Sequence, residues 1–230
     1  MPIKFKASGW KPGEQALDFL VFFIWAYLFV NLDNVVAAGY FIFLVIYHLM
    51  REEQKGDKNP TVYPISWKPY GNLFRDILLG LTLGLGYLYF TAGIFGSLVL
   101  SILAGSLLQG LGLLATMSPV VAILVSGPLV AYTEEKFFRG AMLPFVTSII
   151  GANLLLNAVA NGCIFALWHL LVYGVTNNQA LLVAGVFGSF TSIVVWNKME
   201  LKHAMVAHAL FNTVIVAISY GMLNLAFLGL

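Results

Sequence analysis

Four charged residues stand together in the stretch Thr133-Glu134-Glu135-Lys136-Phe137-Phe138-Arg139-Gly140. Apolar runs lie on both sides of it, Ala122–Ala131 before and Ala141–Ile150 after. The chain of 230 residues is 60% hydrophobic and only 10% charged. Ionisable side chains at membrane depth are costly, so they usually pair with one another or line a cavity. The stretch is therefore a candidate functional site that the fold has to bury.

Repeated apolar runs predict an all-α, polytopic membrane protein, because helices satisfy their own backbone hydrogen bonds in lipid. We expect about eight transmembrane helices that enclose an intramembrane cavity. The expected spans are Ala16–Val30, Val35–Met50, Asp76–Ile94, Leu98–Met117, Pro119–Val146, Ala152–Tyr173, Ala180–Trp196 and Lys202–Leu225. Gly151 separates the fifth span from the sixth, and Pro128 is expected to kink the fifth span before Glu134.

The spans form a single domain in two parts. Residues 1–117 are expected to be N-terminal membrane helices with an interfacial loop at 51–75, and residues 118–225 the core that carries the candidate site. Eight of the 12 basic residues precede the first span or lie in that loop. Basic residues favour the cytoplasmic side, so we expect a multi-pass membrane protein with a cytoplasmic N-terminus. Their positions favour contact with the lipid bilayer over nucleic acid. Cys163, the single cysteine, is expected to be a small buried hydrophobe.

Polar and aromatic side chains recur at a spacing of one helical turn in three segments. The pairs are Glu135 and Arg139, Phe165 and His169, and His208 and Asn212. Residues four apart share a helix face, so Glu135 and Arg139 can form an ion pair. Glu134 points about 100° away from Glu135 on an ideal helix. One carboxylate can thus be held by the arginine while the other faces a cavity.

These residue types suit the hydrolysis of a peptide bond. The reaction needs a base that activates water and hydrogen-bond donors for the oxyanion that develops on the carbonyl. A glutamate and a histidine can activate water, and a second histidine and an asparagine amide can donate. Two histidines and one glutamate also form a known zinc ligand set, so a zinc ion on Glu134, His169 and His208 stays open at this point.

The three motifs resemble those of a known family, in their usual order. They are Glu134-Glu135-x-x-x-Arg139, Phe165-x-x-x-His169 and His208-x-x-x-Asn212, together with Phe138-Arg139-Gly140 and Leu143-Pro144. The sequence is similar here to the CAAX-protease and bacteriocin-processing family, intramembrane endopeptidases of the type II CAAX prenyl endopeptidase kind. The resemblance covers about Ser118 to Asn212, and the N-terminal half shows only the hydrophobic pattern.

The resemblance implies a role for each motif residue. Glu134 would be the general base, and His169 would hold the water with it. His208 and Asn212 would form the oxyanion hole. The supporting residues would be Glu135 and Arg139, which would shape the site or contact the substrate, and Phe165, which would pack beside His169.

The resemblance also implies a substrate class, a membrane-embedded or lipidated peptide such as a prenylated CAAX tail. We favour metal-free chemistry without a cofactor, because asparagine is a poor zinc ligand and a good amide donor. A zinc-dependent protease is the alternative within this family.

Three further interpretations stay open. The chain could be a non-catalytic membrane immunity or binding protein. It could be a transporter in which the glutamates and histidines relay protons. Ser189 and His208 could also form a catalytic dyad. Each motif has a structural explanation as well, since buried ion pairs and hydrogen bonds between membrane helices commonly serve packing alone.

Overall fold

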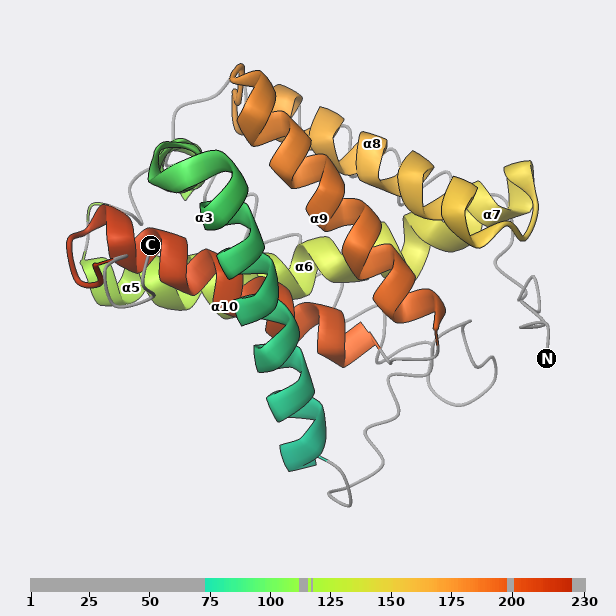
Figure 1. The fold of residues 1–230 in the computed structure, drawn as a ribbon, viewed down its shortest axis with the longest axis horizontal. Helices are drawn as coiled ribbons and strands as arrows, with labels where there is room; N and C mark the ends of the chain where they lie inside the picture. The colour runs from blue at the N-terminus through green and yellow to red at the C-terminus, as the bar shows by residue number, and fades with distance from the viewer. Residues whose placement is uncertain (1–72, 112–115, 117, 198–200, 225–230) are drawn as a thin grey trace.

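The computed structural model describes residues 73–111, 116, 118–197 and 201–224 (Figure 1). Every regular element in these ranges is a helix, which confirms the all-α prediction for the described part of the chain. The elements are α3 (Leu73–Leu111), α5 (Pro119–Leu124), η1 (Val125–Val130), α6 (Ala131–Glu135), η2 (Lys136–Met142), α7 (Leu143–Ile150), α8 (Leu154–Val172), α9 (Asn178–Trp196) and α10 (Leu201–Ser219).

Four described helices are long and apolar enough to cross a membrane. They are Phe74–Gln109, Leu154–Leu171, Asn178–Trp196 and Leu201–Ser219. The protein is therefore an integral membrane protein built from apolar helices. The expected spans Ala16–Val30 and Val35–Met50, and the interfacial loop up to residue 72, lie outside the described residues. The count of eight spans and the side of the N-terminus stay predictions.

Helix α3 joins the two spans that the sequence predicts between residues 76 and 117. Both lie in one helical element that is interrupted at Gly96, whose φ of 76° and ψ of 176° are not helical. Glycine alone adopts such backbone angles readily. The chain bends there, and the part of α3 after the bend turns over the other helices (Figure 1). This second part contributes Leu103 and Ser106 to the cavity described below.

Residues 119–150 run through five consecutive helical elements that include two π-helical turns, η1 and η2. Ser118 caps the start by accepting a hydrogen bond from the amide of Val121, and Gly151, with a φ of 82°, ends the helix. Pro128 lies inside η1, where its missing N–H removes a helical hydrogen bond. Where the sequence predicts a kink before Glu134, the structure has a π-helical turn around Pro128. The second π-turn, which carries Arg139, was not predicted.

Glycines bring the remaining helices close together. α8 and α9 lie side by side in Figure 1, and a Cβ on Gly162 of α8 would overlap Ser189 Oγ and the carbonyl of Gly185. α10 packs against α3 where a Cβ on Gly84 would meet the Ala207 carbonyl at 2.8 Å. Small residues of this kind allow membrane helices to approach closely. α10 is thereby held between α3 and the helix that carries Glu134.

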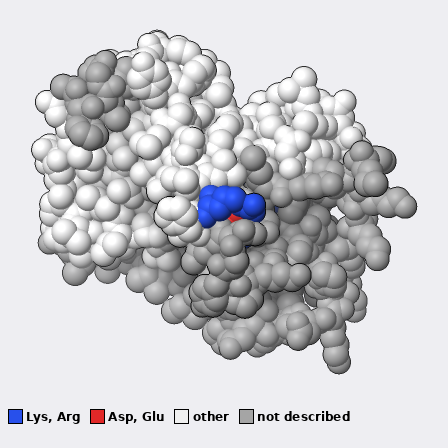
Figure 2. Space-filling model, turned by 60° about the horizontal axis from the view of Figure 1, so that its bottom comes forward, with Lys and Arg blue, Asp and Glu red and all other residues white. Residues whose placement is uncertain are grey.

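The outward-facing surface of the described helices is apolar. Large exposed hydrophobic side chains include Phe74, Tyr89, Leu98, Leu124, Ile149 and Leu155. Figure 2 shows one nearly uncharged face with a small cluster of basic residues beside an acidic one. The described residues make such a cluster where α3 and α10 begin, since Asp76 pairs with Lys202 at 2.5 Å and with His203 at 3.1 Å. Cys163 is exposed on α8, so the prediction that it is buried was wrong.

Candidate active site

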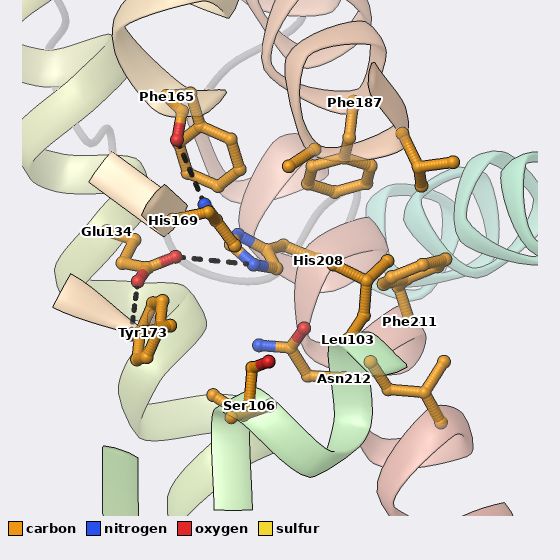
Figure 3. Close-up of a pocket in the computed structure, with 14 residues that line it drawn as sticks. Leu103, Ser106, Glu134, Phe165, His169, Tyr173, Phe187, His208, Phe211 and Asn212 are labelled. Carbon is orange, nitrogen blue, oxygen red and sulfur yellow. Dashed lines mark hydrogen bonds and ion pairs between the residues drawn. The ribbon is translucent and has the colours of Figure 1, made fainter. Parts of the chain in front are cut away.

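The three sequence motifs meet at one cavity (Figure 3). Its polar lining consists of Ser106, Glu134, His169, Tyr173, His208 and Asn212. The remaining lining is apolar and comes from α3, α8, α9 and α10: Leu103, Leu107, Phe165, Val183, Ala184, Phe187, Phe211 and Ile215. The space open to the centres of water molecules is about 30 Å³, more than the roughly 10–15 Å³ that one water requires. A water molecule can therefore occupy a site among these polar groups.

Glu135 and Arg139 form the ion pair that their spacing predicts. Arg139 Nη1 lies 3.0 Å from Glu135 Oε1, and both side chains are fully buried. Arg139 also donates from Nη2 to the carbonyl of Gly188 at 3.1 Å, and its guanidinium carbon lies 4.6 Å from the centre of the Phe165 ring. The arginine thus links η2, α8 and α9. Neither member of the pair lines the cavity.

Glu134 points away from this ion pair and into the cavity, as its helical position predicts. Its Oε1 accepts hydrogen bonds from Tyr173 Oη at 2.6 Å and from Trp168 Nε1 at 3.1 Å. Its Oε2 lies 3.6 Å from His208 Nε2. Tyr173 follows the membrane span of α8, and burial together with the nearby Glu134 carboxylate raises the pKa of its phenol well above the usual value. The phenol therefore remains a hydrogen-bond donor.

His169 is oriented by the backbone of its own helix. Its Nδ1 lies 2.9 Å from the carbonyl oxygen of Phe165, one turn earlier. A carbonyl only accepts hydrogen bonds, so Nδ1 must carry the proton, and Nε2 of the neutral ring is an acceptor. The Phe165 ring packs on the imidazole with 4.6 Å between the ring centres, which places Phe165 beside His169 as expected. An acceptor nitrogen at the cavity can receive a hydrogen bond from a water molecule.

His208 lies between the two carboxylates. Its Nδ1 is 2.8 Å from Glu135 Oε1 and its Nε2 is 3.6 Å from Glu134 Oε2. A carboxylate only accepts hydrogen bonds, so Nδ1 donates to Glu135 Oε1, while Nε2 faces Glu134 at a distance too long for a hydrogen bond. One turn later, Asn212 donates from Nδ2 to the carbonyl of Ser126 at 2.9 Å, which orients its amide. A primary amide has two N–H hydrogens, so a second one is left to donate to a ligand in the cavity.

The candidate zinc ligands Glu134, His169 and His208 all line the cavity. Within the described ranges, however, no group of three His, Cys, Asp or Glu residues is close enough to hold one metal ion. The three side chains share the cavity without converging on a single point as ligands.

Ser189 does not take part in this arrangement. Its hydroxyl donates to the Gly185 carbonyl at 3.0 Å, within its own helix, and Ser189 is not among the residues that line the cavity. The structure therefore does not pair it with His208, whose nitrogens face Glu134 and Glu135.

The sequence analysis missed the two donors that hold Glu134. Tyr173 follows His169 by one helical turn, so their shared helix face was a signal that could have identified it. Trp168 stands in an apolar run, but a buried indole N–H usually has a hydrogen-bond partner. Neither signal names the partner, because Glu134 is more than thirty residues away in the sequence.

One comparison with known proteins gave a match. Residues 116–214 match the family described as Type II CAAX prenyl endopeptidase Rce1-like. All seven motif residues fall inside that range. The searches of curated proteins and of solved structures returned no match.

Proposed function

We propose that this membrane protein is an intramembrane endopeptidase that hydrolyses a peptide bond through water activated by glutamate and histidine. The match of residues 116–214 to the type II CAAX prenyl endopeptidase Rce1-like family supports this proposal. The observation that carries the proposal is the meeting of Glu134, His169, His208 and Asn212 at one cavity with room for water. Each of the three motifs supplies a different function to that cavity.

The first step is the activation of water. Glu134 accepts a proton from a water molecule that also donates a hydrogen bond to Nε2 of His169. The oxygen of this water attacks the carbonyl carbon of the substrate. Bases placed in this way typically accelerate a reaction by about 10²–10⁴-fold.

The attack produces a tetrahedral intermediate with a negatively charged oxygen. His208 Nε2 and the second amide hydrogen of Asn212 donate to this oxyanion. Glu135, itself paired with Arg139, holds Nδ1 of His208 at 2.8 Å and so keeps the ring in place. The C–N bond then breaks, and the leaving amine takes the proton from Glu134. Every step is assigned to side chains, with no metal or other cofactor.

The apolar part of the cavity supports a membrane-associated substrate. Leucine, valine and phenylalanine side chains from four helices surround the polar groups, and the outer surface of the same helices is apolar. A substrate can therefore remain in a lipid-like environment up to the scissile bond. A lipidated peptide of the prenylated CAAX type fits this description.

The test is proteolysis by the purified protein in lipid. Prenylated CAAX peptides, their unprenylated counterparts and a mixed library of membrane peptides are offered to the wild type and to Glu134→Gln. We expect cleavage by the wild type and a kcat/KM about 10²–10⁴-fold lower in the variant. Undiminished cleavage by Glu134→Gln would disprove its assignment as the base.

The same assay separates the alternatives. Cleavage that survives a metal chelator supports metal-free glutamate chemistry, whereas cleavage lost with the chelator and restored by zinc supports the zinc-dependent protease. If the folded wild type cleaves nothing in the library, the result favours a non-catalytic membrane immunity or binding protein.

A further inference from the structure

The two carboxylate oxygens of Glu134 have different surroundings. Oε1 accepts from Tyr173 Oη at 2.6 Å, whereas Oε2 lies opposite His208 Nε2 at 3.6 Å (Figure 3). Oε1 also accepts from Trp168 Nε1 at 3.1 Å. All four residues are nearly or fully buried. The asymmetry is therefore maintained by side chains that are themselves fixed by packing.

Two donors on one oxygen determine how the carboxylate is oriented. They restrict rotation about the last side-chain bond of Glu134, and they use the two lone pairs that Oε1 offers in hydrogen bonding. Oε2 is then the oxygen with remaining capacity to accept a proton. Bringing a base within hydrogen-bond reach of its proton is a geometric requirement, and small misplacements slow catalysis strongly.

We propose that Tyr173 and Trp168 are positioning residues that hold Glu134 so that Oε2, not Oε1, accepts the proton of the catalytic water. The inference rests on the proposed function of Glu134 as the base, and it adds which oxygen acts and which side chains select it. Both residues act through Glu134 in this role.

The role has a consequence that infrared spectroscopy can measure. Hydrogen bonds to one oxygen change the stretching bands of a carboxylate, so removing one of the two donors to Oε1 should shift those bands. The other ionisable groups near Glu134 are His169 of α8, His208 of α10, and Glu135 and Arg139 of its own helix. The described cavity residues of α3 and α9 are not ionisable. These surroundings stay the same when only the Tyr173 hydroxyl is removed.

The experiment compares Tyr173→Phe with Tyr87→Phe in the full-length protein in lipid. Tyr87 is a matched control, because its buried phenol also donates a short hydrogen bond, to the Val183 carbonyl at 2.7 Å, but does not line the cavity. One measurement is of kcat and KM. The other is the infrared absorbance of the carboxylate stretching bands, assigned to Glu134 by their loss in Glu134→Gln. The second measurement does not require cleavage.

In Tyr173→Phe we expect the infrared stretching bands of the Glu134 carboxylate to shift, because Oε1 loses one of its two donors. We also expect kcat to fall by about 10-fold with KM within about 2-fold of the wild type. Trp168→Phe should have both effects, and Tyr87→Phe should have neither.

Unchanged carboxylate bands in Tyr173→Phe would overturn the inference, even if activity fell. Shifted bands in a protein whose wild type cleaves no peptide would support the orientation of Glu134 while contradicting the proposed protease function. The two failures are therefore distinguishable.

Discussion

At the scale of single residues, two buried asparagine side chains each donate a hydrogen bond to a backbone carbonyl, but only one of them lines the cavity. Asn212 donates to the carbonyl of Ser126 and lines the cavity, whereas Asn161 donates to the carbonyl of Phe138 and does not. Loss of an oxyanion donor typically lowers kcat by about 10²–10³-fold. We expect this loss in Asn212→Ala, with little change in KM, from steady-state kinetics on a cleaved peptide.

Asn161→Ala is the matched control for that prediction. This substitution also leaves a buried carbonyl, that of Phe138, without its donor. The melting temperature of Asn161→Ala should therefore fall about as much as that of Asn212→Ala. The kcat of the folded protein should stay at the wild-type value. Equal losses of kcat in both variants would show that Asn212 acts through packing alone and would remove it from the oxyanion hole.

The residues predicted correctly from the sequence are those whose geometry follows from one helix. The Glu135–Arg139 pair and the divergence of Glu134 from Glu135 depend only on helical spacing, and the structure has both. Tyr173 and Trp168 were missed because their partner lies on another helix. Which distant residue a side chain reaches is decided by packing between helices, and a single sequence does not contain that information directly.

At the scale of helices, the contact between α8 and α9 depends on Gly162. A Cβ there would overlap Ser189 Oγ and the Gly185 carbonyl, and the second of these is backbone that cannot rotate away. We expect Gly162→Ala to destabilise the protein by about 1–3 kcal/mol, seen as a melting temperature lower by roughly 2–10 °C in detergent. Because Phe165 and His169 follow on the same helix, activity should fall as well.

Gly86→Ala provides the control within α3. A Cβ on Gly86 would meet nothing within 4 Å, and alanine is favoured over glycine inside a helix by about 0.5–1 kcal/mol. This variant should be as stable as the wild type or slightly more stable. If both variants melt like the wild type, the close contact at Gly162 does not limit stability.

Helix boundaries were predictable where glycine or proline marks them, and less so elsewhere. Gly96 falls between two predicted spans and Gly151 ends a third, and both adopt positive φ angles. The π-turn at Lys136–Met142 contains Gly140, but a glycine inside a helical run does not by itself indicate a π-turn. The turn carries Arg139, whose contacts with Gly188 of α9 and Phe165 of α8 belong to the packed molecule and are not specified by local sequence.

At the scale of the whole molecule, the contacts determine which helix ends lie on the same side of the membrane. Asp76 at the start of α3 pairs with Lys202 at the start of α10, and α10 follows closely after the end of α9. Arg75 and the start of α9 should therefore lie on opposite sides. In a Cys163→Ala background, we expect Arg75→Cys to be protected from an impermeant maleimide in intact cells and Gln179→Cys to be labelled.

The labelling also tests the cytoplasmic placement of the basic N-terminal part, which lies outside the described residues. The reverse pattern would invert the predicted orientation. Equal labelling of both cysteines from one side would indicate an even number of crossings between them, as four separate spans would give, and would contradict the arrangement in which Asp76 and Lys202 share a side and α9 crosses the membrane.

The burial of Glu134, Glu135 and Arg139 in one helix has a consequence for the biosynthesis of the protein. A charged residue at the centre of an isolated membrane helix costs about 2.5–3.5 kcal/mol during insertion. The side chains and carbonyls from other helices that offset this cost belong to Trp168, Tyr173, Gly188 and His208, all of which are later in the chain. The helix at 119–150 therefore leaves the ribosome before its partners exist, and its stable integration into the bilayer has to wait for the synthesis of α10.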